Sequence, residues 1–288
     1  MRRAICLSIL ASVLLAGCSD HFQTVKYAPA IKQKAIVSLS PSATEIMASV
    51  LGLTSIVGRT ASDDYPPTIL SKTVVASVKP DYEKIKSMSP DLVVYDDQLY
   101  NASDVAKIKE IGAPTFAITG NTVDDFEKCL LAMGDVTLTQ TGMNDYILRI
   151  DDAKKISLAD KLPSKPRVAV IIPGHGGASM VAGTKSFIAD VVRIAGGEPV
   201  GPAQDHFVPA DPESLISFNP DIIIMPTSQK TKEADLSSIL NDPRLKNTNA
   251  VKSNKVKGFD EDIVERRGAR VDSFITNAHK LIGSEAGS

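Results

Sequence analysis

Short apolar runs along the chain alternate with segments whose apolar residues recur at helical spacing. In the first half, the runs that predict strands are residues 35–39, 55–58, 73–77, 92–95 and 115–118. A helix is expected between the first two runs, with Ser42 or Thr44 as its N-cap and Gly52 just beyond its end. Strands that alternate with helices favour a parallel sheet, so this half predicts an α/β lobe.

A long helix is predicted in the middle of the chain. Residues 139–162 contain no proline, their apolar positions mostly follow helical spacing, and Pro163 closes the segment. A second α/β pattern follows, with a strand at 167–172 and a helix at 186–195. A single rigid helix between two lobes limits hinge closure. The predicted domains are an N-terminal lobe (35–138), a connecting helix (139–163) and a C-terminal lobe (164–288).

One 14-residue pattern occurs twice, 130 positions apart, as Asp81–Val94 and Asp211–Ile224. Each copy predicts a short helix, a turn and a buried strand. Solenoid repeats have periods of roughly 20–50 residues, so this spacing indicates two similar lobes instead. Two-lobed proteins usually hold something between the lobes. The identical pairs are Asp81/Asp211, Glu83/Glu213, Ser87/Ser217, Pro90/Pro220 and Asp91/Asp221.

The N-terminus has the features of an export signal. Arg2 and Arg3 precede an apolar run of 13 residues, which is too short to span a bilayer and is typical of a signal peptide over residues 1–17. The segment that ends at Cys18 (Leu-Ala-Gly-Cys) resembles a bacterial lipobox, in which the cysteine is acylated; a plain secretory signal is the alternative. Residues 18–34 are polar and form a tether. We expect a protein outside the cytoplasm, held to the membrane by lipid at Cys18, on the periplasmic face in a Gram-negative cell.

Charge and motif content exclude several classes of function. The net charge is −2 and there is no basic block, so nucleic acid is not an expected partner. Once Cys6 is removed with the signal and Cys18 is acylated, Cys129 is left alone in a helical apolar pattern, where we expect a core residue and no disulfide. Hydrolase motifs and histidine clusters with metal spacing are absent from the sequence, so we expect no catalytic residues, no structural metal site and no cofactor.

Several motifs in this order resemble one known family. They are Ile36–Glu45 (Ile-Val-Ser-Leu-Ser-Pro-Ser-Ala-Thr-Glu), Asp64–Pro67 (Asp-Tyr-Pro-Pro), Gly183–Asp190, Ala195–Gly197 and Glu265–Arg270 (Glu-Arg-Arg-Gly-Ala-Arg). The chain is similar over residues 35–283 to the substrate-binding proteins of bacterial ABC importers for vitamin B12, ferric siderophores and haem. The resemblance implies two Rossmann-like lobes bridged by one helix, a shallow ligand cleft between them, a monomer, and no catalysis. The Asp-Tyr-Pro-Pro segment resembles the vitamin B12-binding branch most.

The same resemblance implies a bulky metal-centred ligand, either cobalamin or another corrinoid or a ferric siderophore, with haem as the alternative. Open α/β sheets bind ligands at loops beyond the carboxyl ends of their strands. The two loop histidines either contact the ligand or face water. The chain has no tryptophan, and a serine stands where the vitamin B12-binding branch tends to carry an aromatic residue. The candidate ligand-binding residues are Ser62, Tyr95, Tyr100, His175, His206, Phe207 and Arg266.

Two charged groups have competing interpretations. Arg266 and Arg267 either bind an anionic group of the ligand or pair with Glu265 or Asp262 nearby in the sequence. In the family, one glutamate per lobe docks on arginines of the membrane permease, a dimer that works with an ATPase. The resemblance implies this role for Glu83 and Glu213, and a solvated helix face is the alternative. A ligand sensor that presents its bound state to a signalling partner is a further alternative for the whole protein.

Overall fold

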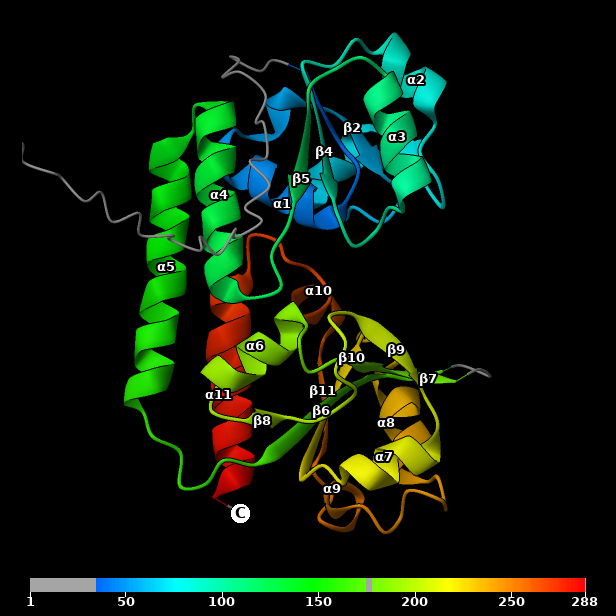
Figure 1. Cartoon of the computed structure of the whole chain (residues 1–288), viewed down its shortest axis with the longest axis vertical. Coiled ribbons are helices and arrows are strands. Elements are labelled where there is room, and N and C mark those ends of the chain that lie inside the picture. Colours follow the sequence, from blue (N-terminus) through cyan, green and yellow to red (C-terminus); the bar gives the residue numbers. More distant parts are fainter. Residues whose placement is uncertain (1–34, 175–177, 288) are drawn as a thin grey trace, which may run out of the picture.

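The computed structural model describes residues 35–174 and 178–287, which form two α/β lobes stacked along the long axis of the molecule (Figure 1). The N-terminal lobe contains a five-stranded parallel sheet with the order β3-β2-β1-β4-β5. This agrees with the prediction from alternating strands and helices. Its strands are β1 (Ile36–Ser38), β2 (Ile56–Thr60), β3 (Thr73–Ala76), β4 (Leu92–Asp96) and β5 (Thr115–Ile118).

The first helix begins earlier than the sequence predicted. In α1 (Pro41–Val50), the Oγ of Ser40 accepts a hydrogen bond from the backbone N–H of Ala43 at 3.1 Å, so Ser40 is the N-cap. The prediction of Ser42 or Thr44 was wrong because proline is well suited to the first helical position, which places the cap one residue before it. Thr44 instead donates its hydroxyl to Asp63 at 2.7 Å. The remaining N-lobe elements are α2 (Tyr82–Ser87), α3 (Ala102–Glu110) and two 3-10 turns (Leu53–Ser55 and Pro67–Ser71).

Three long helices run along one side of the molecule and join the lobes (Figure 1). They are α4 (Val123–Thr137), α5 (Gln140–Ala159) and α11 (Val271–Ala286). The chain passes from the N-lobe into the C-terminal lobe through α5. Tyr146 of α5 donates its hydroxyl to the carbonyl of Gly268 at 2.6 Å, which fastens this helix to the segment that leads into α11.

The C-terminal lobe repeats the parallel arrangement only in part. Its sheet has the order β11-β10-β6-β7-β9, with β8 beside β6. The neighbours β6, β10, β11 and β8 are parallel, whereas β7 and β9 are antiparallel additions. Parallel neighbours need a crossover of a dozen or more residues, and the connection from β6 to β7 is shorter than that. The strands are β6 (Arg167–Ile172), β7 (Ser179–Ala182), β8 (Glu198–Pro199), β9 (Phe207–Ala210), β10 (Ile222–Thr227) and β11 (Val256–Asp260).

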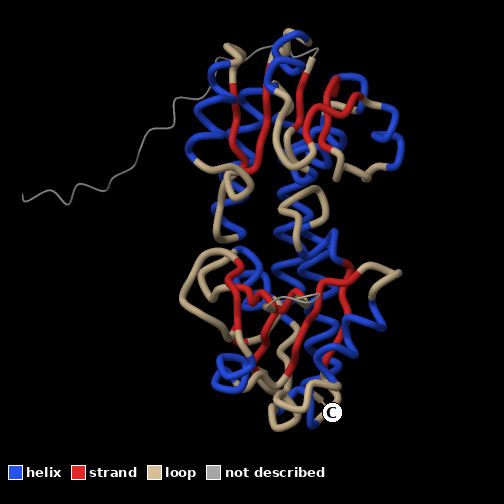
Figure 2. The backbone as a smooth tube through the Cα atoms, turned by 90° about the vertical axis from the view of Figure 1, so that its right-hand side faces the viewer, coloured by secondary structure: helices blue, strands red, loops and turns tan. Residues whose placement is uncertain are grey.

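Helices cover both faces of each sheet, as the backbone trace shows from the side (Figure 2). The largest buried apolar cluster extends from β1 and α1 through α4, α5 and α11 to β6 and α6, so both lobes share one hydrophobic core along the helical side. Smaller clusters fill the outer face of each sheet. Among the described residues, no helix combines the length and the hydropathy that crossing a bilayer requires. The C-lobe helices are α6 (Phe187–Ile194), α7 (Pro212–Phe218), α8 (Lys232–Leu240), α9 (Asn249–Lys252) and α10 (Glu261–Val264).

Candidate functional site

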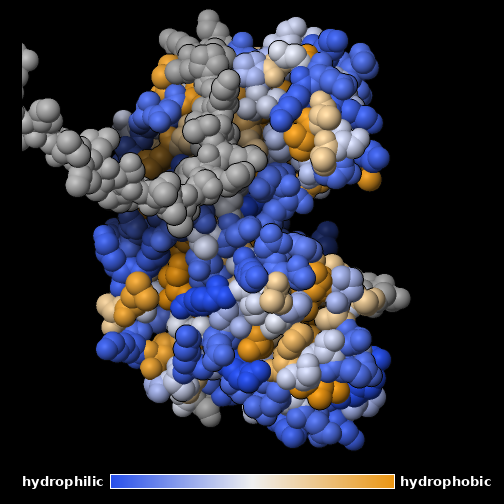
Figure 3. All heavy atoms as spheres, viewed as in Figure 1, coloured by the Kyte–Doolittle hydropathy of each residue, from blue (hydrophilic) through white to orange (hydrophobic). Residues whose placement is uncertain are grey.

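The carboxyl ends of the parallel strands in the two lobes face each other. Asp96, the last residue of β4, contacts Arg267, which follows β11 and α10 in the other lobe. The surface is hollowed between the lobes on the side away from α5, and hydrophilic residues border the hollow (Figure 3). Strand ends of open α/β sheets are where such folds bind ligands. We call this space between the lobes the cleft.

A pocket of about 380 Å³ lies at the carboxyl ends of β10 and β11. Three of its lining residues are acidic, Asp260, Glu261 and Asp262, and one is basic, Lys232. Burial raises the pKa of the Glu261 carboxyl, and the nearby carboxylate of Asp262 raises it further. The pocket therefore favours hydrogen-bond donors and positive groups over anions. The other lining residues are Thr227, Ser228, Gln229, Gly258 and Phe259.

The segment 265–270, which we call the arginine strap, crosses from the C-lobe to the N-lobe. Glu45 of α1 has a side chain that is 1% exposed and accepts hydrogen bonds from both ends of the strap. Its carboxylate receives Arg266 Nη1 at 3.2 Å, Arg270 Nη2 at 2.7 Å and Nε at 3.2 Å, and the N–H of Ala269 at 3.3 Å. A carboxylate that is almost fully buried thus has charged partners on the opposite lobe.

The central arginine of the strap is also bonded to the N-lobe. Arg267 has a side chain that is 5% exposed; it donates to the carboxylates of Asp96 and Asp97 and to the carbonyl of Gly120, the last at 2.7 Å. Burial lowers the pKa of Arg267, but the two carboxylates outweigh it and raise the pKa above its usual value. This guanidinium therefore stays charged inside the protein.

Of the two interpretations of Arg266, the structure contains the ion pair with Asp262. Arg266 also donates to Asp64 at 2.7 Å and to the carbonyl of Ser62 at 3.5 Å. The carboxylates raise the pKa of Arg266 despite its burial. This guanidinium already has carboxylate partners, so it could bind an anionic ligand only if one of them moved away. Contact between Arg266 and a ligand therefore stays a prediction. Ser62 itself is exposed at the rim of the cleft.

The two tyrosines of the predicted site lie together in the N-lobe. Tyr95 is 6% exposed and stands edge-on to Tyr100, with ring centroids 6.1 Å apart. Tyr100 donates its hydroxyl to the carbonyl of Leu39 at 2.6 Å, and burial raises the pKa of its phenol. Both rings pack on the face of the sheet that α2 and α3 cover. Their contact with a ligand stays a prediction.

The loop before β9 places two predicted residues in the C-lobe. His206 is exposed, and its Nδ1 lies 2.7 Å from Asp205 Oδ1. Phe207, at the start of β9, is partly buried against the shared core. Asp205 also accepts a hydrogen bond across the cleft from the amide of Asn121, at 3.5 Å. The predictions for His175 and for Cys18 fall outside the described residues.

The two copies of the repeat have the same local structure. Asp81 and Asp211 are the N-caps of α2 and α7, each accepting from the N–H three residues on, at 3.0 and 2.8 Å. Ser87 and Ser217 each donate to the carbonyl three residues back, at 2.7 Å. The residues at the turn, Ser89 and Asn219, both have positive φ, 48° and 38°. The same sequence pattern therefore produces the same helix–turn–strand unit twice.

Two further identical pairs complete the unit. Pro90 and Pro220 are buried. The carboxylate of Asp91 accepts the N–H of Ala35, just before β1, at 3.0 Å, and that of Asp221 accepts the N–H of Arg167, the first residue of β6, at 2.9 Å. The remaining pair is Glu83 and Glu213, which are exposed on the first turn of α2 and α7. Both helices lie on the side of the molecule opposite α5 (Figure 1).

Sequence reasoning did not single out three contacts of the strap as site residues. They are Glu45, Asp64 and Asp96. Glu45 closes the quoted Ser-Ala-Thr-Glu motif, and a glutamate on the buried face of an otherwise apolar helix is a signal for a buried ion pair. Within residues 35–174 and 178–287, no group of three or more histidine, cysteine, aspartate or glutamate side chains is arranged to hold a metal ion.

Comparisons with known proteins agree with this architecture. The chain is similar to an uncharacterised ABC transporter substrate-binding lipoprotein, YvrC, of Bacillus subtilis, with 25% identity over 91% of each chain. It is 24% identical to a cobalamin-binding protein of Halobacterium salinarum, over 82% of this chain and 66% of that protein. Among solved structures, the vitamin B12-binding protein BtuF of Vibrio cholerae shares the fold, with a TM-score of 0.76 at 18% identity over 89% of this chain and 99% of that one.

The family assignment comes from a match that covers most of the chain. A family model described as "Periplasmic binding protein" matches residues 36–263, which include both sheets and the helices α4 and α5 but not α11. Proteins of this kind bind substrates for transporters and are not enzymes. The chain belongs to the periplasmic binding protein family.

Proposed function

We propose that this protein captures a bulky metal chelate in the cleft and delivers it to the permease of an ABC importer, whose ATPase drives uptake. The observation that carries the proposal is the cleft itself, with strand ends of two lobes facing each other in a chain of a binding-protein family. A relative of similar length is a transporter lipoprotein, and another is a cobalamin-binding protein. A ligand sensor would share this architecture but would need no permease, so uptake decides between them.

The charges at the cleft favour a neutral or cationic chelate. The three arginines of the strap are all paired with carboxylates, and the pocket beside them carries three acidic residues and one lysine. A corrinoid presents amide groups that donate hydrogen bonds, which suits such a pocket. The carboxylates of haem would meet like charge there. We therefore favour a corrinoid, with haem as the alternative.

The repeat supports docking through Glu83 and Glu213. The other four identical pairs cap a helix, close a turn, fill the core or start a strand, so their identity follows from the fold. An exposed glutamate in the first turn of a helix interacts with the helix dipole, which contributes about 0.3–1 kcal/mol, but an aspartate would do the same, so the fold alone does not explain a glutamate in both copies. The helices that carry this pair, α2 and α7, are on the side where the cleft opens (Figures 1 and 3). Two equivalent acidic groups suit a two-fold symmetric permease.

Acylation at Cys18 would hold the protein at the membrane near that permease. The support is the sequence ending in Leu-Ala-Gly-Cys18 and the lipoprotein name of the relative in Bacillus subtilis. Cys18→Ala should move the protein from the membrane fraction to the soluble fraction. Equal partitioning of the two forms would contradict the anchor.

The ligand is tested first with the purified protein. Cobinamide, cyanocobalamin, haemin and a ferric siderophore are compared by thermal shift and then by calorimetry. We expect a corrinoid to raise the melting temperature, since a ligand at 100 times its Kd adds about 2.7 kcal/mol of stability. Preference for haemin would reverse the charge argument, and no binding by any of the four would reject the ligand class.

Delivery is tested with paired glutamate variants. Glu83→Ala/Glu213→Ala should bind the ligand with unchanged Kd but support little uptake into vesicles that contain the cognate importer. Each exposed ion pair contributes about 0–1 kcal/mol, so the single variants should lose less than the double. The control is Glu110→Ala/Glu233→Ala, which removes two exposed glutamates from α3 and α8 with the same change of charge. Full uptake by the first double variant would return this pair to a solvated helix face.

A further inference from the structure

The arginine strap belongs to the C-lobe by sequence, yet its charged groups are bonded to the N-lobe. Glu45 accepts four hydrogen bonds from three strap residues, and Arg267 bonds to two carboxylates at the end of β4. Both Glu45 and Arg267 are almost completely buried, at 2% and 4% exposure. The strap therefore crosses the floor of the cleft and is not a loose loop over its mouth.

The backbone of the strap is shaped around the Glu45 carboxylate. A Cβ on Gly268 would lie 2.5 Å from Glu45 Oε2, so only glycine lets the carboxylate approach this closely. On its other side, the carbonyl of Gly268 accepts the hydroxyl of Tyr146, and the same hydroxyl accepts the N–H of Val271 at 3.1 Å. The strap is thus fixed between α1 and α5 at both its backbone and its side chains.

The strap also connects to the walls of the cleft. Arg270 lies over the ring of Tyr65, 4.6 Å from its centroid, and Arg266 joins Asp64 on the N-lobe to Asp262 in the wall of the C-lobe pocket. The shared apolar core holds the lobes together along α4, α5 and α11, whereas these ion pairs hold them on the cleft side of α5. A change in the angle between the lobes would separate buried charges, which is strongly unfavourable.

We propose that Glu45 is a positioning residue, which fixes the separation of the two lobes through the arginine strap and so sets the width of the ligand cleft. This deepens the proposed function, since it rests on a ligand being held between the lobes. Glu45 itself is too deeply buried to touch that ligand. Its role is to hold Arg266 and Arg270, so that the cleft keeps one width with and without ligand.

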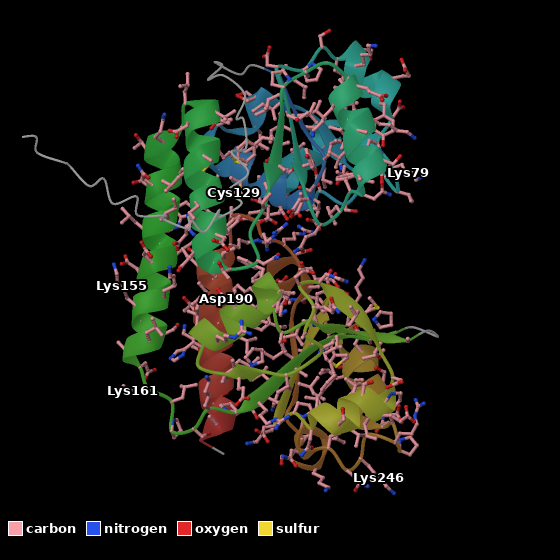
Figure 4. All side chains as sticks on the ribbon, viewed as in Figure 1. Lys79, Cys129, Lys155, Lys161, Asp190 and Lys246 are labelled. Carbon is pink, nitrogen blue, oxygen red and sulfur yellow. The ribbon has the colours of Figure 1, made fainter. Side chains whose placement is uncertain are left out.

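The test measures the distance between the lobes directly. Spin labels are placed at Lys79→Cys on the N-lobe and Lys246→Cys on the C-lobe, both exposed and at opposite ends of the cleft side (Figure 4). Cys129 is buried and so stays unlabelled, and Cys18 is replaced by alanine in every labelled form. We expect a narrow distance distribution for the labelled wild type and a broader one, shifted to longer distances, for Glu45→Gln.

The control removes an exposed partner of the same strap. The side chain of Asp64 is 54% exposed and bonds only Arg266 of the strap. When Asp64 is neutralised, Arg266 still has its ion pairs with Glu45 and Asp262. Asp64→Asn should therefore keep the narrow distribution. Arg270→Gln is the second test variant, for the case that Glu45→Gln folds poorly. It keeps Glu45 and removes the guanidinium that donates two of the four hydrogen bonds to its carboxylate. Wild-type distributions in Glu45→Gln and Arg270→Gln would overturn the proposal.

Ligand affinity gives an independent readout. With cyanocobalamin and haemin as probes, Glu45→Gln should lose at least about tenfold in affinity for the probe that wild type prefers. The reason is that a change in cleft width displaces hydrogen-bonding groups of the cleft walls from the ligand, although Glu45 itself does not touch it. Asp64→Asn should change that affinity by less. A broadened distribution with unchanged affinity would show that the strap does not set the cleft for the ligand. If wild type binds neither probe, cobinamide and the ferric siderophore remain to be tested as ligands, while the distance comparison still decides whether the strap fixes the lobes.

Discussion

The two lobes build the same helix–turn–strand unit, but at their contact on the cleft side they contribute side chains of opposite charge. Within the repeat, caps, turns and buried prolines coincide residue for residue. Outside it, the N-lobe contributes the carboxylates of Glu45, Asp96 and Asp97 to the interface, and the C-lobe contributes the arginines of the strap. The comparison teaches that the repeated residues determine how each lobe folds, whereas residues outside the repeat determine how the lobes meet.

The largest loss of stability is expected from a substitution at the contact between the lobes. Arg267→Met should lower the free energy of unfolding by roughly 3–5 kcal/mol, because it leaves the buried carboxylate of Asp96 without its cation. The matched control is Arg149→Met, which breaks a pair with Asp272 in which the arginine side chain is 53% exposed and should cost under about 1 kcal/mol. Urea denaturation of both variants measures the difference. Equal small losses would mean that the lobes do not depend on this charge.

The same variant should show a characteristic dependence on pH. Burial raises the pKa of the Asp96 carboxyl, and without the arginine nothing of opposite charge counters it. A carboxyl with a raised pKa in the folded state stabilises the fold below its unfolded pKa of about 3.9, and this contribution is lost as the pH rises through the folded pKa. The deficit of Arg267→Met against wild type should therefore shrink at acidic pH. A deficit that grows on acidification would contradict an unpaired Asp96 as its cause.

Much of the fold could be predicted from the sequence because its signals are local. The apolar runs locate the strands of the N-lobe, and the repeat identifies α2 with β4 and α7 with β10. The N-cap of α1 was misplaced because Ser40, Ser42 and Thr44 are all good caps, and the position of Pro41 decides among them. The antiparallel strands β7 and β9 were missed because they read as loops between stronger signals.

The site was less predictable because its contacts are distant in sequence. Glu45 and Arg266 are 221 positions apart, and nothing near either residue indicates the other. Sequence reasoning left Arg266 between a ligand contact and an ion pair with Asp262; the pair is present, but the two N-lobe partners were not foreseen. Loops at strand ends could be identified, whereas the pairing of their charges depends on how the lobes stack.

Loss of the N-cap aspartate should cause a smaller loss of stability, equal in the two lobes. Asp81→Ala and Asp211→Ala each remove the carboxylate that caps a short helix, at 3.0 and 2.8 Å from the N–H that it accepts. Each should cost about 1 kcal/mol of stability in urea denaturation. Asp152→Ala on α5 serves as the control, since its pair with Lys155 is exposed on both sides and should contribute little. A loss in only one of the two cap variants would show that the repeated units are not energetically equivalent.

A last change in stability, of similar size, should separate the lobes by its sign. Ser89 and Asn219 occupy the same turn with positive φ, where most side chains are strained and asparagine is one of the few that are tolerated. Ser89→Gly relieves that strain and should stabilise the protein by up to about 1 kcal/mol. Asn219 tolerates the conformation, and its Oδ1 accepts the N–H of Asn249 at 3.0 Å, so Asn219→Gly loses a hydrogen bond and should destabilise by about 0.5–1.5 kcal/mol. Differential scanning calorimetry of the two variants measures both shifts. Because the backbone is the same at both turns, opposite shifts would assign the difference to the side chain alone, and two shifts of the same sign would assign it to the backbone.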